Sequence, residues 1–163
     1  MTRIALLLLC LQAFPALAYD LNGISIGGKE IDARKAMPSA NCKALEWKSD
    51  AADRRCDDAR VAVGGVESRV TVFLKAGVIQ AYDVRFDVKN LERMKTHLRS
   101  RWGAPLAEAT ENIARKDAKD RQVLKMRWEK GADRAVLVAQ LEKKKASLEV
   151  SRGGFPEEIY RVR

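Results

Sequence analysis

The pattern of apolar and polar positions predicts two helices. In residues 88–102, apolar side chains recur at steps of three and four, as one face of a helix requires: Val88, Leu91, Met94, Leu98 and Trp102. Asp87 is expected to cap this helix at its N-terminus, and Gly103 is expected to end it. A shorter helix is expected over residues 29–37, where Pro38 stops it.

Other segments alternate with a period of two, which is typical of half-buried strands. About seven strands are expected, at residues 44–48, 61–63, 69–75, 78–87, 124–129, 135–141 and 147–151, with a shorter one at 21–26. Short glycine-containing turns favour antiparallel pairing. Residues 53–58 are interpreted as a charged loop, and residues 106–121 leave two alternatives, a helix or a solvated loop.

These elements predict an α+β fold, in which an antiparallel sheet of about seven strands carries both helices on one side. The 163 residues have room for one domain, expected to cover residues 19–163. A helix precedes a set of strands twice, which suggests two halves, residues 19–87 and 88–163.

The first 18 residues have the organisation of a secretory signal peptide. Arg3 supplies a positive charge, residues 4–11 are apolar, and Ala16-Leu17-Ala18 forms a cleavage site. The uncharged stretch is shorter than the roughly 20 apolar residues of a transmembrane helix. We therefore expect cleavage after Ala18 and a periplasmic or secreted protein.

Cleavage would leave two cysteines, Cys42 and Cys56. In an oxidising compartment such a pair is expected to form a disulfide, which would stabilise the fold by about 3 kcal/mol at this loop length. A zinc site would need more ligands than the single histidine, His97, can add. The cysteines are therefore interpreted as structural, and no metal is expected.

The chain is basic, with 31 Lys and Arg against 22 Asp and Glu, a formal charge of +9. Its 47% hydrophobic and 33% charged residues exclude a disordered tail and a membrane bundle. The densest basic positions are candidate binding residues: Lys89, Arg93, Arg99 and Arg101 on the predicted helix, and Lys143, Lys144 and Lys145 in a predicted turn. Trp47, which lies between the cysteines, is a further candidate contact residue.

No pattern in the sequence points to catalysis. A catalytic triad needs a histidine as base, and His97 lies in the basic helix, where a surface position is the simpler interpretation. Calcium-loop, HExxH and Walker motifs do not occur. We therefore expect no catalytic residue and no cofactor.

Two strings resemble those of small bacterial envelope proteins that share the fold of the β-lactamase inhibitor protein and of the BamE-like assembly lipoproteins. They are Gly23-Ile24-Ser25-Ile26-Gly27 before a helix, and residues 98–105, where a helix ends in Trp-Gly-Ala-Pro. The resemblance implies a non-enzymatic binding or scaffold role, and it assigns no functional residue.

The sequence thus predicts a non-enzymatic binding protein of the bacterial envelope. Two alternatives stay open: binding of a polyanion, such as lipid phosphate or cell-wall polymer, and inhibition of an envelope enzyme. The expected partner is an envelope protein or an acidic envelope polymer, not nucleic acid.

Overall fold

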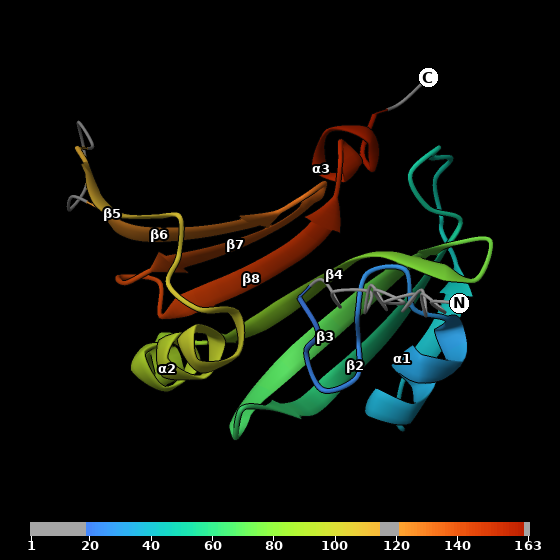
Figure 1. The fold of residues 1–163 in the computed structure, drawn as a ribbon, viewed down its shortest axis with the longest axis horizontal. Coiled ribbons are helices and arrows are strands. Elements are labelled where there is room, and N and C mark those ends of the chain that lie inside the picture. The colour runs from blue at the N-terminus through green and yellow to red at the C-terminus, as the bar shows by residue number, and fades with distance from the viewer. Residues whose placement is uncertain (1–18, 115–120, 162–163) are drawn as a thin grey trace, which may run out of the picture.

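The computed structural model describes residues 19–114 and 121–161, and their strands form one antiparallel sheet. The strand order is β1-β2-β3-β4-β8-β7-β6-β5 (Figure 1). The strands are β1 Asn41–Ala44, β2 Arg54–Val63, β3 Val66–Lys75, β4 Val78–Asp87, β5 Ala107–Ile113, β6 Arg121–Lys130, β7 Asp133–Gln140 and β8 Lys145–Arg152. The predicted antiparallel sheet is confirmed, but it has eight strands instead of about seven. The protein is predominantly β rather than clearly α+β.

The helices are short. They are α1 Glu30–Ala36, the 3-10 turn η1 Val88–Asn90, α2 Leu91–Trp102 and α3 Phe155–Glu158. Asp87 caps η1 as predicted, accepting a hydrogen bond of 2.8 Å from the backbone N–H of Lys89. Helices α1 and α2 lie on one side of the sheet, and α3 lies on the other (Figure 1).

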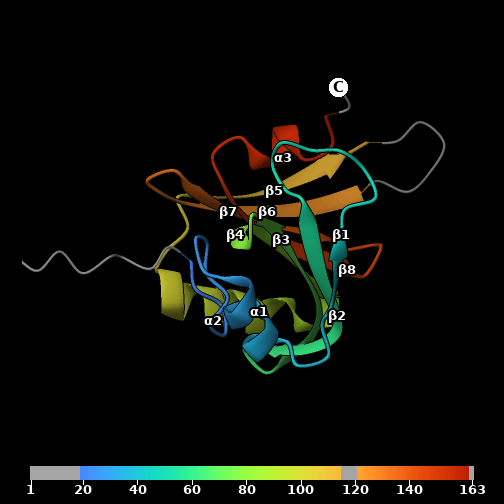
Figure 2. The same cartoon turned by 90° about the vertical axis from the view of Figure 1, so that its right-hand side faces the viewer.

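The side of the sheet that α1 and α2 cover is the core face. Tyr82 of β4 and Leu148 of β8 are fully buried there with Leu98 of α2. Each strand presents alternate residues to this face, which explains the period of two in the sequence. Figure 2 shows the sheet twisting around the two helices from β6 to β2.

The start of the described chain is held in this core. The Tyr82 hydroxyl donates a hydrogen bond to the carbonyl oxygen of Tyr19. The Tyr19 ring packs edge-on against Trp102, with ring centroids 5.0 Å apart. The strand expected at residues 21–26 is reduced to one isolated bridge, between Leu21 and Ile24.

Two predictions near the cysteines were wrong. Of residues 53–58, interpreted as a loop, residues 54–58 begin strand β2, where Arg55 and Asp57 alternate with the buried Cys56 and Asp58. Their charges pair with each other, Arg55 Nε lying 3.1 Å from Asp57 Oδ2. Conversely, residues 45–48 follow β1 instead of forming a strand.

The prediction of a helix or a loop for residues 106–121 was wrong over residues 107–113, which form the edge strand β5. Every β5 residue is exposed, so the segment has no apolar alternation from which a strand could be inferred. The charged stretch that follows lies mostly in residues 115–120, outside the described residues.

The two parts of the sheet have the same element order. A helix precedes four antiparallel strands in each, α1 before β1 to β4 and α2 before β5 to β8. The last strands, β4 and β8, pair with each other in the middle of the sheet. The predicted signal peptide, residues 1–18, lies outside the described residues. None of the helices in the described residues is long and apolar enough to cross a membrane.

Candidate functional site

The face of the sheet opposite α1 and α2, here called the second face, is the main candidate surface. Its middle is a row of polar side chains on neighbouring strands: Thr71 on β3 is opposite Asp83 on β4, and Asp83 is opposite Glu149 on β8. In the next row Arg69 is opposite Arg85. The polar positions of the strand pattern therefore converge on one surface.

Two adjoining hollows cross this face and together form what we call the trough. One, of about 410 Å³, lies toward α3, and the other, of about 680 Å³, lies toward the turn between β7 and β8. Arg69, Arg85 and Ser147 line both, so the hollows are continuous.

The α3 end of the trough is closed by a small apolar cluster. Phe155 of α3 packs on Phe73 of β3, with ring centroids 5.4 Å apart. Trp47 donates its indole N–H to the carbonyl oxygen of Ile159 at 2.8 Å and stacks on Tyr160 at 5.7 Å between centroids. The predicted contact residue Trp47 is thus half-buried and holds the C-terminal segment, while Tyr160 is 68% exposed beside it.

Three carboxylates line the middle of the trough. Asp57 accepts a hydrogen bond of 2.7 Å from the hydroxyl of Thr71. Burial raises the pKa of Asp83 above its usual value, although Arg85 Nε lies 2.6 Å away and opposes the shift. Loss of hydration, with the charge of Asp83 in second place, also raises the pKa of Glu149. For both acids, the folded state therefore favours the protonated form more than the unfolded chain does.

The other end of the trough gathers cations. Arg69, Lys144 and Lys145 line it together with the acids Glu67 and Asp87, and the three cationic side chains are exposed. No carboxylate in the described part of the chain forms an ion pair with any of them. The direct opposition of Arg69 and Arg85 is repulsive, so an anion between them would be attracted. Lys143, the third lysine of the turn, is exposed beside them.

The basic positions on α2 are largely engaged within the chain. Arg99 pairs with Glu108 of β5, and Arg101 pairs with Asp20 at 2.5 Å. Arg93 points to the carbonyl oxygen of Gly65 at 3.4 Å, and the backbone of Lys89 is part of the Asp87 cap. The side chains of Arg93, Arg99 and Arg101 are therefore engaged within the chain. Lys89 of η1 differs, because it follows Val88, whose backbone N–H donates to the carbonyl oxygen of Lys144 at 3.2 Å beside the β7–β8 turn.

His97 is half-buried on α2, between the helix and the β2–β3 turn. Its Nε2 atom has no hydrogen-bond partner among the described residues. Burial, with the charge of Arg101 in second place, lowers its pKa below 6.5. The ring lies away from the trough and contributes nothing to it.

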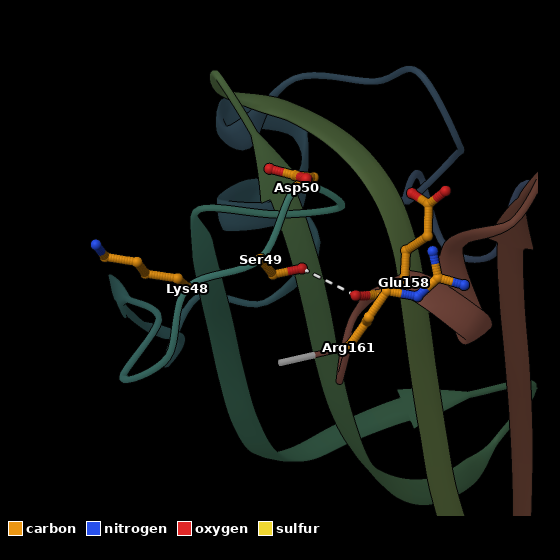
Figure 3. Close-up of a pocket in the computed structure, with 5 residues that line it drawn as sticks. All are labelled: Lys48, Ser49, Asp50, Glu158 and Arg161. Atoms are coloured by element: carbon orange, nitrogen blue, oxygen red, sulfur yellow. Dashed lines mark hydrogen bonds between the residues drawn. The ribbon is translucent and has the colours of Figure 1, made fainter. Parts of the chain in front are cut away.

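A third hollow, of about 180 Å³, lies between the loop before β2 and the C-terminal segment. Figure 3 shows Ser49 directed at the backbone of Glu158, to which its hydroxyl donates at 3.4 Å, and Lys48 pointing away. Because these side chains do not converge on a common point, the hollow is better explained as the contact that holds the two segments together.

Cys42 and Cys56 form the predicted disulfide, which joins directly paired residues of β1 and β2. The carboxylate of Glu30 lies close to both sulfurs. Sulfurs that are bonded to each other do not supply thiolate ligands. Glu30 itself pairs with Arg34 at 2.7 Å and with Arg54 at 3.4 Å.

Sequence reasoning missed Arg69 and Arg85 as candidate residues. Both occupy polar positions of strands that were predicted, so their face could be inferred. What the sequence does not show is that β4 pairs with β8, which brings Arg85 near Lys144 and Lys145.

Comparisons with protein-family models, with curated proteins and with solved structures found no match to this chain. The functional argument therefore depends on the geometry of the trough.

Proposed function

We propose that the chain is an exported, non-enzymatic binding protein of the bacterial envelope, and that the trough binds an acidic region of a partner protein. The signal-peptide pattern of residues 1–18 supports export, and the disulfide between Cys42 and Cys56 is compatible with an oxidising compartment.

One observation carries the proposal: Arg69, Lys144 and Lys145 gather at one end of the trough and form no ion pair in the described residues, although Glu67 and Asp87 line the same hollow and Asp87 is opposite Lys145. Exposed cations of this kind attract acidic groups over distances of about 10 Å at moderate salt, which steers a partner to the surface.

The rest of the trough favours a protein over a uniform polyanion. Asp83 and Glu149 lie at its centre, where a polymer with a charge on every unit would meet like charges. A folded partner can place acidic side chains on the cations and other groups over the acids and the exposed ring of Tyr160. A polyanion on α2 is less favoured, because Arg99 and Arg101 already pair with Glu108 and Asp20.

A retention experiment with three forms of the mature protein tests the proposal. The immobilised wild type is exposed to an envelope extract beside a trough variant, Arg69→Glu with Lys144→Glu and Lys145→Glu, and a helix variant, Arg93→Glu with Arg99→Glu. We expect one discrete protein to be retained by the wild type and the helix variant, to be lost by the trough variant, and to be released by salt. Retention by the trough variant contradicts the proposal, as does retention of only lipid or wall polymer.

A second candidate function is favoured by one specific observation. Asp83 and Glu149 are adjacent carboxyl groups with raised pKa values, an arrangement that hydrolases use for general acid catalysis. The double variant Asp83→Asn with Glu149→Gln separates the two functions. Turnover of a glycoside or ester substrate that disappears in this variant supports the hydrolase, whereas unchanged partner retention supports the binding protein.

A further inference from the structure

The outer side of the edge strand β5 is open to pairing, because no strand in the described part of the chain lies against it. It lies at the end of the strand order and pairs only with β6 (Figures 1 and 2). All seven of its residues are exposed. An edge of this kind presents a row of backbone N–H and C=O groups that can pair with another strand.

The usual protection of such an edge is weak here. Edge strands are commonly guarded by lysine, proline or free charges, and β5 contains neither lysine nor proline. Its two acids are engaged within the chain. Glu108 pairs with Arg99 and with Lys95, the latter at 3.5 Å, and Glu111 pairs with Lys125 at 2.9 Å.

The opposite edge of the sheet differs. Strand β1 has only four residues and includes a lysine, Lys43. Apolar side chains are also exposed at both ends of β5, with Leu106 63% and Ile113 44% exposed. The features that favour strand addition are therefore concentrated at one edge.

We propose that β5 pairs antiparallel with β5 of a second copy of this chain, which joins the two sheets into one. Two-fold symmetry places a residue of the strand opposite itself, and the register centred on Thr110 is the one that pairs the whole strand. It sets Ala107 opposite Ile113, Glu108 opposite Asn112, and Ala109 opposite Glu111. No like charges are directly opposed, and Ile113 gains an apolar neighbour.

The register favours a second copy of the chain as the occupant, because the self-paired strand opposes no like charges and places Ile113 beside Ala107. Since directly paired residues point to the same side of a sheet, the second faces of both copies lie on the same side. The dimer consequently presents two troughs on one surface. Pairing at β5 does not depend on what the trough binds.

The test uses the mature chain with its native disulfide. We expect sedimentation in the micromolar range to give twice the mass of one copy, and Thr110→Cys to form a covalent dimer on mild oxidation. Thr96→Cys, an exposed Thr-to-Cys change on α2, is the matched control and should remain uncrosslinked.

The variant Thr110→Lys tests the dimer without a covalent crosslink. It places two ammonium groups opposite each other, so dimer dissociation should become at least tenfold easier while the melting temperature of the monomer is unchanged. A monomeric wild type throughout the micromolar range overturns the proposal. Crosslinking of the Thr110→Cys variant that is no faster than that of the Thr96→Cys variant overturns it as well.

Discussion

The imidazole of His97 on α2 lies directly against Gly64 in the turn between β2 and β3. A Cβ atom placed on Gly64 would stand 2.5 Å from Cγ of His97, and the φ angle of Gly64 is +56°. The neighbouring Gly65 has a φ of +75° but no atom within 4 Å of such a Cβ. Gly64 is therefore required by both its backbone conformation and its packing against His97, whereas Gly65 is required by its backbone conformation alone.

This pair predicts unequal effects of two alanine substitutions. Gly65→Ala should cost about 1 kcal/mol of unfolding free energy through left-handed backbone strain. Gly64→Ala should cost about 1–3 kcal/mol more, because the methyl group displaces the imidazole. Urea unfolding measures both values. Equal losses would contradict the contact, and His97→Ala in the Gly64→Ala background should recover the difference.

A second prediction concerns the buried hydroxyl of Tyr82. Tyr82→Phe removes the donor to the carbonyl oxygen of Tyr19 and should cost about 1–3 kcal/mol, because a buried acceptor loses its partner. Tyr160→Phe is the control, since that ring is 68% exposed and should change stability by less than about 0.5 kcal/mol. Thermal unfolding of both variants gives the comparison. Equal stability of the two would contradict the anchoring of residue 19.

The two buried tyrosines also predict a loss of stability at alkaline pH. Burial raises the pKa of Tyr19 from 10.0 to about 12 and holds that of Tyr82 well above its usual value. The unfolded chain releases these protons first, so the free energy of unfolding should fall as pH rises above 10.0. Equilibrium unfolding across this range measures the slope, which should be smaller in Tyr82→Phe.

The raised pKa of Asp83 predicts a pH-dependent effect of Asp83→Asn. The folded state favours the protonated acid, so this contribution to stability is complete below the usual pKa of 3.8 and is lost as pH rises through the raised value. Relative to the wild type, the variant should therefore gain stability between acidic and neutral pH. Unfolding at several pH values tests the sign, and a difference that does not vary with pH contradicts it.

Removal of the disulfide is expected to cause a larger loss of stability. Replacing Cys42 and Cys56 by serine should lower the free energy of unfolding by about 3 kcal/mol, because the open loop has more conformational freedom when unfolded. Guanidinium unfolding provides the measurement, and reductant should have no further effect on the double variant. An unchanged midpoint would mean that β1 is held by its other contacts.

Most strands could be predicted because each buries one side. Strands β3, β4, β7 and β8 alternate apolar and polar residues, and the sequence shows this directly. Strand β5 could not be found in this way, because as an edge strand it has no buried residue. The start of β2 was missed because its charged residues are typical of a loop. Arg55 and Asp57 pair with each other in the strand, and the sequence alone does not show this ion pair.

The candidate site was predictable only in part. The three lysines 143–145 were named from their density, and two of them line the trough. Their neighbours Arg69 and Arg85 come from strands distant in sequence, and only the pairing of β4 with β8 brings the groups together. The basic face of α2 was named for the same reason as the lysines, but Arg99 and Arg101 lie beside acids that come from β5 and the N-terminal segment.

The central claim is that the trough holds an acidic region of a protein partner, and photo-crosslinking in the native envelope tests it most directly. A photoreactive residue replaces Ser147, which both hollows share, or Thr96 on α2 as the control. We predict one discrete protein adduct from position 147, none from position 96, and loss of the adduct when Arg69, Lys144 and Lys145 are changed to glutamate. An adduct that forms equally from both positions, or that persists after charge reversal, would contradict the account.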